Sequence, residues 1–345
     1  MPKISIFVPI YDTTKYLPRC LDSILNQTLT DIEVILGTDG PQNCDDICAA
    51  YAAKDARVKI VFHAGSYGKA FNQALILAAG EYIGIVEADD WCRTDMFERL
   101  YTAAKKADAD VCKGGFRRAF DDAAKNASIL FTSDDAVFNI AEKPDLLSFQ
   151  PSIWSAIYKT DFLRKNDITM IPECMPFIDA PFHMETLLKA DKIASVAEPL
   201  YFYYQDNPNQ SVKNERASFA GLKAEEYLYD KIPPQTLNDI LAAYFFKSTL
   251  SRLSWDYGRL TDAENKTEFK AKAAEFFNRL SVSPDRKTVG KQLMRFYNFI
   301  MGKVPTLDVE YTNFGQRLFY LKNRDGWKTM NLCGLKFKLY RKGKK

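Results

Sequence analysis

The sequence predicts an α/β fold in which a mostly parallel sheet is flanked by helices and followed by a mainly helical C-terminal region. Over the first 90 residues, short apolar and β-branched runs alternate with helical patterns, as expected for βαβ units. From about residue 216 onward, apolar residues recur instead at three- and four-residue spacing, which is typical of amphipathic helices.

The first third of the chain contains four expected strands and three expected helices. The strands are apolar runs suited to burial in a parallel sheet and cover residues 4–9, 32–37, 58–62 and 82–86. The helices cover residues 16–27, 45–54 and 69–79, and we expect Gly80 to end the third. Further along, we expect a strand at 110–112 and helices at 237–260 and 264–280.

The 345 residues are enough for a large domain and a smaller one. We expect a first domain over residues 1–215, a helical region over 216–321 and a basic amphipathic tail over 322–345. The tail carries nine basic residues and one acidic residue, a net charge of +8. Because the whole chain sums to +3, the body is mildly acidic at −5. An acidic body without a recognition module argues against nucleic-acid binding.

The chain shows no feature of a secreted or membrane-spanning protein. No apolar run approaches the roughly 18 residues that cross a bilayer, and the N-terminus lacks the apolar core of a signal peptide. The seven cysteines form no C-x-x-C pair, and only two histidines are present, which argues against a zinc site. We therefore expect a cytoplasmic protein with free thiols.

Polar residues follow three of the expected strands, and the carboxyl ends of parallel strands share one rim, where ligands bind. Glu87-Ala88-Asp89-Asp90 crowds three carboxylates at one strand end. Carboxylate oxygens suit a divalent ion, Mn or Mg, which would also hold nucleotide phosphates. A solvated acidic loop explains this segment equally well. Asp39-Gly40, on the same rim, would accept hydrogen bonds from a ribose or base, or would form a plain turn.

The ordered set of motifs in the first 90 residues resembles the family 2 glycosyltransferases, which have the GT-A fold. The resemblance continues more loosely to about residue 210. The matching segments are Ile6–Tyr11, Tyr16–Thr28, Ile32–Leu36, Asp39-Gly40, Gly68–Asn72, Ala79–Ile83, Glu87–Trp91, Trp154–Lys159, Phe162-Leu163 and Glu198–Tyr204.

The resemblance implies roles for individual residues of this chain. Asp89 would bind the metal, Glu87 would contact the ribose or a metal-bound water, and Asp179 would be the catalytic base. The positions expected on the donor side are Pro9, Tyr11, Asp39, Gly40, Lys69, Asn72, Glu87, Ala88 and Asp89. The implied reaction is a single displacement with inversion, in which Asp179 takes the proton from the attacking hydroxyl of the acceptor. On the residues alone, Asp179 would equally cap the helix expected from about Ala180.

Four positions depart from the family pattern and leave the donor sugar open. Glu87 stands in place of an Asp, Gly37-Thr38 stands where an Asp often precedes Asp39, and Ile178 replaces a Glu before Asp179. Phe71 stands where the family often has an Arg, so one phosphate or sugar contact would either be absent or be supplied by Lys69.

Two aromatic residues and one histidine have competing interpretations. Trp91 and Trp154 would stack on a sugar of the acceptor, or would simply pack beside the site. His183 lies four residues after Asp179 and would be a distal metal ligand, although a core or surface histidine is the simpler interpretation.

The expected partners are a nucleotide-sugar donor, with UDP as the nucleotide, and a glycan or lipid-linked acceptor from surface-polysaccharide or lipopolysaccharide synthesis. A second copy of the chain is a further candidate. Residues 334–342 begin by alternating apolar and basic side chains, which suits either a strand resting on the inner face of an anionic membrane or a solvated tail.

Three other functions compete with sugar transfer. A dinucleotide-dependent dehydrogenase would carry G-x-G-x-x-G after the first strand, but residues 8–16 contain no glycine. A nucleotidyltransferase would carry a Gly-rich basic loop there, which is also absent from the sequence. A non-catalytic carbohydrate- or nucleotide-binding protein with a decayed site stays open because of the four departures.

Overall fold

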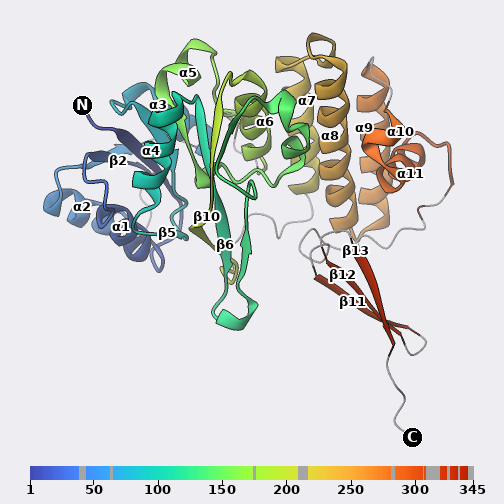
Figure 1. The fold of residues 1–345 in the computed structure, drawn as a ribbon, viewed down its shortest axis with the longest axis horizontal. Helices are drawn as coiled ribbons and strands as arrows, with labels where there is room; N and C mark the ends of the chain where they lie inside the picture. Colours follow the sequence, from blue (N-terminus) through green and yellow to red (C-terminus); the bar gives the residue numbers. More distant parts are fainter. Residues whose placement is uncertain are drawn as a thin grey trace, which may run out of the picture.

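A computed structural model describes residues 1–38, 44–62, 65–173, 176–208, 217–280, 284–305, 307, 319–324, 327–332 and 335–340, the last three segments through their backbone. Its main sheet has the strand order β3-β2-β1-β4-β9-β6-β10-β5, with β7 beside β6 and β8 beside β10. Figure 1 shows the helical region beyond α6, on the side away from the N-terminal half of this sheet.

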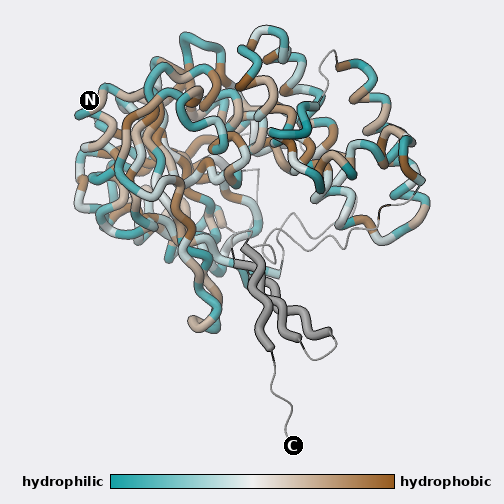
Figure 2. The backbone as a smooth tube through the Cα atoms, turned by 45° about the vertical axis from the view of Figure 1, so that its right-hand side comes forward, coloured by the Kyte–Doolittle hydropathy of each residue, from teal (hydrophilic) through white to brown (hydrophobic). Residues whose placement is uncertain are grey.

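The N-terminal half of the sheet consists of parallel strands, as predicted. Its elements are β1 (Ile4–Ile10), α1 (Leu17–Leu25), β2 (Ile32–Thr38), α2 (Asp45–Lys54), β3 (Val58–Phe62), α3 (Tyr67–Leu77) and β4 (Tyr82–Ile85). β1 pairs in parallel with β2 and β4, and β2 with β3. All of β2 is buried, and Figure 2 shows apolar stretches running through these central strands. The carboxyl ends of β1, β2 and β4 therefore lie on one rim.

The end of α3 corrects one expectation. The helix stops at Leu77 rather than Ala79, so Gly80 does not terminate it. Gly80 is instead required by close packing, because a Cβ there would lie 2.4 Å from the backbone nitrogen of Ser5. Glu33 accepts hydrogen bonds from Ser5 Oγ at 2.5 Å and from the Ala79 amide at 2.7 Å. These contacts place the start of β4 beside β1.

The second half of the sheet is mixed. It contains β5 (Trp91–Cys92), α4 (Met96–Ala107), β6 (Val111–Ala119), β7 (Ala127–Ile129), β8 (Ala136–Phe138), β9 (Ala156–Lys159), α5 (Thr160–Lys165), α6 (Asp179–Lys189) and β10 (Ile193–Tyr204). β9 runs antiparallel to both β4 and β6, while β6 and β10 are parallel. Short 3₁₀ turns cover residues 123–125, 140–142, 144–148, 153–155 and 234–236. The expected strand at 110–112 is only the start of β6, because Lys113-Gly114-Gly115 interrupts its apolar pattern.

The C-terminal region is mainly helical, as predicted. Its helices are α7 (Ala217–Lys231), α8 (Asp239–Arg259), α9 (Ala263–Arg279), α10 (Arg286–Val289) and α11 (Lys291–Ile300). Asn238 and Asp262 cap α8 and α9 by accepting bonds from the amides of Leu241 and Asn265 at 2.9 and 2.8 Å. The helices enclose a core of aromatic side chains that includes Phe245, Phe246, Phe269 and Phe276.

Beyond the helices, the backbone forms a separate antiparallel sheet of β11 (Phe319–Arg324), β12 (Trp327–Leu332) and β13 (Leu335–Tyr340). The strand expected in the basic tail is therefore confirmed at Leu335–Tyr340. Among the described residues, no helix has both the length and the apolar character that crossing a membrane requires.

Candidate active site

Three carboxylates follow β4 at the rim of the sheet, but they are not equivalent. Glu87 and Asp89 are partly buried, whereas Asp90 is fully buried. Asp90 accepts a hydrogen bond from the hydroxyl of Tyr201 at 2.8 Å and one from the amide of Tyr204 at 2.7 Å. Asp90 therefore fastens the segment to β10, while Glu87 and Asp89 face the site.

Glu87 is held by two tyrosines from different elements. Its Oε1 accepts a 2.7 Å hydrogen bond from the hydroxyl of Tyr67, at the start of α3, and its amide donates to the hydroxyl of Tyr201 at 3.0 Å. Burial, reinforced by the charges of Asp89 and Asp179, raises the pKa of Glu87 to about 8, although the Tyr67 hydrogen bond opposes this rise. The extra methylene of Glu87, relative to the family's Asp, is accommodated by the contact with Tyr67.

Asp89 is held by two side chains, one from near the start and one from near the end of the first domain's sequence. Its Oδ2 accepts a 2.7 Å hydrogen bond from Asn207, which follows β10, and its carbonyl oxygen accepts one from Arg19 of α1 at 3.0 Å. Burial raises the pKa of Asp89, while the Asn207 hydrogen bond and the charge of Arg19 oppose the rise. Glu87 and Asp89 thus form a partly buried pair of carboxyl groups, the carboxyl pair.

Asp179 is the first residue of α6, since Ile178 occupies the N-cap position without a side-chain cap. The capping alternative is therefore wrong for Asp179. Its carboxylate accepts a 3.0 Å bond from the amide of Ala180 and carries a favourable charge at the helix N-terminus. Its charge influences the pKa of both Glu87 and Tyr67, so Asp179 lies near Glu87 although the two residues are 92 positions apart in the sequence.

The surroundings of Asp179 tune its acidity. Burial raises the pKa of the Asp179 carboxyl to about 6, and the rise is limited by the Ala180 amide and by the positive charges of Arg252 and Lys113. Lys113 lies on β6 with 1% of its surface exposed, and burial lowers its pKa to about 7. A carboxyl group with a pKa near 6 is ionised at neutral pH and can accept a proton.

The carboxyl pair has the chemistry of a site for a divalent ion. Across the part of the chain that the structure describes, no three His, Cys, Asp or Glu side chains are arranged to bind a metal. Mg²⁺ is commonly bound by one or two carboxylates together with substrate phosphates and water. Glu87 and Asp89 supply two such carboxylates, and the charge of Asp89 adds to the burial that raises the pKa of Glu87. This donor set fits a metal that arrives with a diphosphate.

The other positions expected on the donor side lie in different environments. Pro9 is partly buried near the end of β1, Tyr11 is 67% exposed beyond it, and Ala88 is buried. Lys69 is exposed on the first turn of α3. Asp39 and Gly40 lie outside the described residues.

Asn72 and its neighbours hold the chain segment that leads towards Asp179. The side-chain amide of Asn72 donates a hydrogen bond to the carbonyl oxygen of Met170 and accepts one from its backbone N–H, both at 2.9 Å. The hydroxyl of Ser66 donates to the carbonyl oxygen of Pro172 at 2.6 Å. A Cβ on Gly68 would lie 1.8 Å from the carbonyl oxygen of Ile171, so only glycine permits this approach. The Gly68–Asn72 motif therefore has a structural role that sequence reasoning did not predict.

Both tryptophans proposed for the acceptor side are engaged in packing. The Trp91 indole stacks on Phe202 at 5.2 Å between ring centroids, and the guanidinium of Arg19 lies 3.7 Å from the centre of its ring. Trp154 is buried and stacks on Tyr201 at 4.3 Å. These contacts favour the packing alternative for both residues.

His183 is buried on α6, and within the described structure its Nε2 has no hydrogen-bond partner. Burial and the charges of Lys113 and Arg252 lower its pKa well below the ordinary value. The cationic surroundings favour a neutral core histidine over a distal metal ligand.

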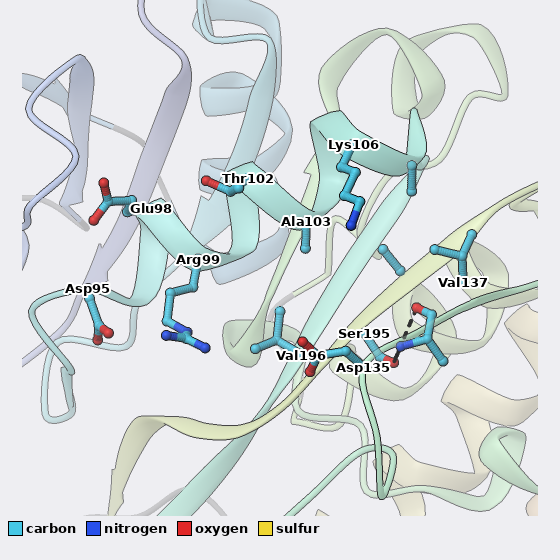
Figure 3. A pocket seen from close by; sticks show the side chains of 13 residues that line it. Asp95, Glu98, Arg99, Thr102, Ala103, Lys106, Asp135, Val137, Ser195 and Val196 are labelled. Carbon is cyan, nitrogen blue, oxygen red and sulfur yellow. Dashed lines mark hydrogen bonds between the residues drawn. The ribbon is translucent and has the colours of Figure 1, made fainter.

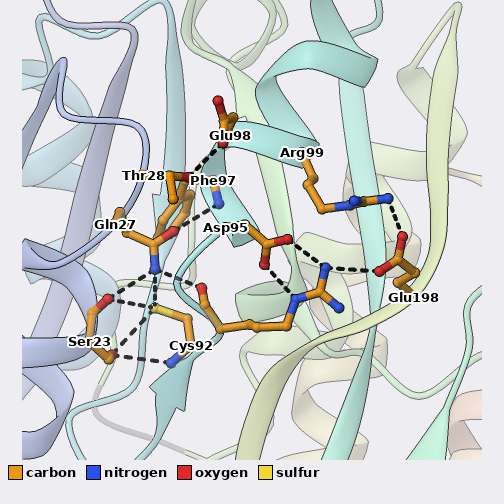
Figure 4. Close-up of polar contacts among 10 residues, drawn as sticks. Ser23, Gln27, Thr28, Cys92, Asp95, Phe97, Glu98, Arg99 and Glu198 are labelled. Atoms are coloured by element: carbon orange, nitrogen blue, oxygen red, sulfur yellow. Dashed lines mark hydrogen bonds and ion pairs between the residues drawn. The ribbon is translucent and has the colours of Figure 1, made fainter.

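A buried glutamine fixes the segment that follows the carboxylates (Figure 4). Gln27, at the end of α1, donates to the carbonyl of Arg93 at 2.7 Å and accepts from the amide of Phe97 at 3.1 Å. Thr28 next to it donates to Glu98 at 2.6 Å. Gln27 and Thr28 thus connect the end of α1 to the residue after β5 and to α4. In the sequence, these two residues were notable only as the end of a segment that resembles the family.

The surface also has a groove of about 670 Å³ between α4, β8 and β10 (Figure 3). Charged side chains of both signs line it, including Glu98, Arg99, Lys106 and Asp135. No residue predicted for the site is among its lining residues, so this groove is separate from the rim that carries Glu87 and Asp89.

Sequence reasoning assigned no role to Arg19, Tyr67, Tyr201 or Asn207, although all four contact the carboxylate segment. The aromatic run at 201–204 was visible in the sequence, and its resemblance to the family was the available signal for Tyr201. Tyr67 and Asn207 carried no local signal, because their roles depend on contacts with residues 20 and 118 positions away.

This chain is similar to known glycosyltransferases in sequence and in fold. The model of the family described as "Glycosyl transferase family 2" matches residues 5–171. The glycosyltransferase GlyG of Streptococcus pneumoniae is 32% identical over 211 residues, which cover 58% of this chain and 70% of that protein. The poly(ribitol-phosphate) beta-glucosyltransferase of Bacillus spizizenii is 27% identical over 288 residues, covering 81% of this chain and 44% of that protein.

A third relative, the uncharacterized glycosyltransferase EpsJ of Bacillus subtilis, is 30% identical over 217 residues. That match covers 61% of this chain, and the chain spans only 62% of the length of EpsJ. Among solved structures, S. aureus TarS 1–349 in complex with UDP-GlcNAc superposes with a TM-score of 0.73 over 99% of both chains, at 19% identity. This likeness establishes the GT-A fold.

Proposed function

The chain belongs to glycosyltransferase family 2, and on that premise we propose that it transfers a sugar from a UDP-sugar to an acceptor hydroxyl with inversion. One observation supports the proposal: the charge of Asp179, whose carboxyl has a pKa of about 6, adds to the burial that raises the pKa of Glu87, so Asp179 lies near the carboxyl pair at the carboxyl ends of the parallel strands. A base and a diphosphate site placed together are what this reaction requires.

The donor would lie along the rim formed by β1, β2 and β4, with its diphosphate at Asp89 and Glu87. These two residues would hold a divalent ion, Mn or Mg, which when bound would neutralise charge on the leaving diphosphate. Asn207 and Arg19 keep the Asp89 segment in place through its carboxylate and its carbonyl oxygen. Tyr67 fixes the carboxylate of Glu87 through its hydroxyl. Asp39, Gly40, Pro9, Tyr11 and Lys69 stay our predictions for the rest of the donor site.

The base would work from the N-terminus of α6. Asp179 accepts the proton of the acceptor hydroxyl as that oxygen forms its bond to the anomeric carbon and the bond to the UDP oxygen breaks. The positive charges of Lys113 and Arg252 favour the ionised carboxylate before this step. Holding donor and acceptor in line provides a large further part of the acceleration.

For the acceptor we propose a growing surface polysaccharide or a lipid-linked glycan, used at the cytoplasmic face of the membrane. The name of the Bacillus spizizenii relative, a poly(ribitol-phosphate) glucosyltransferase, supports this class of acceptor. The strand at Leu335–Tyr340, in which Lys336 and Lys338 alternate with apolar residues, supports a contact with anionic lipid.

The test is a donor screen with the purified chain. Release of UDP would be measured from a panel of UDP-, GDP- and CMP-sugars, with and without Mn. We expect UDP release from one UDP-sugar that requires the metal and is abolished by Asp89→Ala. Binding of UDP without turnover of any donor, with or without a glycan acceptor, would favour the alternative of a binding protein with a decayed site.

A further inference from the structure

The residue two positions before the proposed base has an unusual backbone. Phe177 has a φ of +66°, in the left-handed region that bulky side chains rarely adopt. A residue stays in such a conformation only where its surroundings hold it there, and such residues concentrate at functional sites. Phe177 lies at the entrance to α6, which starts at Asp179.

The contacts that hold Phe177 come from the C-terminal helical region. Its ring packs edge-on against Trp255 of α8, with 5.7 Å between the ring centroids and 85° between their planes. The guanidinium of Arg259, one turn further along α8, lies 4.5 Å from the Trp255 ring centre and 5.4 Å from that of Phe177. Two side chains of one helix therefore enclose this single ring.

Helix α8 is itself firmly placed. Arg252 forms an ion pair with the buried carboxylate of Glu225 on α7, and Asp256 lies 3.6 Å from Arg259. Ser248 donates to the carbonyl of Leu147 in the first domain at 2.6 Å. Because α8 is fixed to both regions, it can serve as a rigid support for Phe177.

We propose that Trp255 and Arg259 are positioning residues, which hold Phe177 in its left-handed conformation and thereby set the place and direction of the Asp179 carboxylate. The helical region then contributes to the active site of the first domain through its contacts with Phe177. This inference rests on the proposed function in one respect only, the role of Asp179 as the base.

Kinetics of the full-length chain test the proposal with matched variants. Trp255→Ala is expected to lower kcat by about tenfold or more while KM for the donor stays unchanged, because a misplaced base slows the chemistry but not binding. Trp255→Phe keeps a ring against Phe177 and should restore most of kcat. Tyr244→Ala removes a partly buried ring elsewhere on α8 and should leave kcat unchanged.

A double-mutant cycle tests whether the effect passes through Phe177. Glycine adopts the left-handed conformation without steric cost, so Phe177→Gly removes the ring while allowing the same backbone. If Trp255 acts through this ring, Trp255→Ala will cause no further loss of kcat in the Phe177→Gly background. Multiplying losses in the double variant would overturn the proposal.

Hydrogen exchange gives an answer that does not depend on turnover. Amide exchange in peptides covering residues 177–182 should quicken in Trp255→Ala but not in Tyr244→Ala, while the thermal transition of both variants stays cooperative. Faster exchange in a protein that turns over no donor would support the positioning contact and refute the proposed function alone. Unchanged exchange in Trp255→Ala would refute the positioning role, whatever the activity.

Discussion

The two sides of the candidate site are built differently. On the donor side, Glu87 and Asp89 extend directly from a buried parallel strand, and no lysine or arginine side chain forms an ion pair with them among the described residues. On the base side, Asp179 is placed by contacts from distant segments and lies in the field of two buried or partly buried cations, Lys113 and Arg252.

The pKa values of Glu87 and Asp179 show the consequence of this difference. Burial raises the pKa of both acids, but that of Glu87 rises to about 8, whereas that of Asp179 reaches only about 6. Asp179 is therefore largely ionised and ready to accept a proton at neutral pH, whereas Glu87 stays largely protonated until a bound cation favours its ionised form. Substitutions on the two sides should have separable effects on binding and on chemistry.

The largest expected effect is on the base side. Asp179→Asn removes the proton acceptor with little change in shape, so the rate of sugar transfer should fall by about 10²- to 10⁴-fold. Asp161→Asn, an exposed carboxylate on α5, serves as the matched control and should transfer sugar at the wild-type rate. Retention of more than a tenth of the activity in Asp179→Asn would assign the base to another group.

A smaller effect, on stability, is expected for Tyr201 on β10, which contacts the carboxylate segment. Tyr201→Phe deletes the hydroxyl that donates to buried Asp90 and accepts from the Glu87 amide. Leaving these buried groups unsatisfied should lower the free energy of unfolding by about 1–3 kcal/mol. Denaturant unfolding measures this loss, and Tyr203→Phe, on the same strand, provides a control. Equal stability of Tyr201→Phe and wild type would show that the hydroxyl contributes nothing.

The charge on the donor side should cost stability. Glu87 has a folded-state pKa of about 8, above its unfolded value, so metal-free wild-type protein loses stability as pH rises from about 4.5 to 8. Glu87→Gln keeps an acceptor for Tyr67 but cannot ionise. Relative to wild type, we expect the stability of this variant to rise by about 4 kcal/mol between pH 4.5 and pH 8. A difference in stability that does not change with pH would contradict the assignment.

The smallest effect concerns the cations on the base side. Transfer should require ionised Asp179, so kcat/KM is expected to fall as pH drops through about 6. Lys113→Met removes a buried positive charge while keeping a similar shape. The acidic limb of the pH profile should then move to higher pH, because the ionised carboxylate loses a favourable neighbour. A limb that stays in place or moves to lower pH would exclude an electrostatic role for Lys113.

The same contrast explains which parts of the fold and of the site could be predicted from the sequence alone. The strands and helices of the parallel half were predicted to within about two residues at either end, because periodicity is a local property of the sequence. Glu87 and Asp89 could be placed on the rim because they directly follow a strand. Asp39 and Gly40 stay predictions, since they lie outside the described residues.

The base side could not be derived in the same way. Asp179 was predicted as the base only through a resemblance to the family. The hydrogen bond from Asn72 to Met170 connects residues that are 98 positions apart in the sequence. The contact of Phe177 with Trp255 spans a similar separation and involves residues with no motif around them. Contacts of this kind depend on tertiary packing, which leaves no periodic signal in the sequence.

The most direct test of a site with separable sides is a calorimetric titration of UDP, with Mn present, into wild type, Asp179→Asn and Asp89→Asn. We predict that Asp179→Asn binds UDP with wild-type affinity although it transfers sugar about 10²- to 10⁴-fold more slowly, and that Asp89→Asn loses most of its affinity. Equal binding by wild type and Asp89→Asn, or loss of binding in Asp179→Asn, would contradict the division between a donor side and a base side.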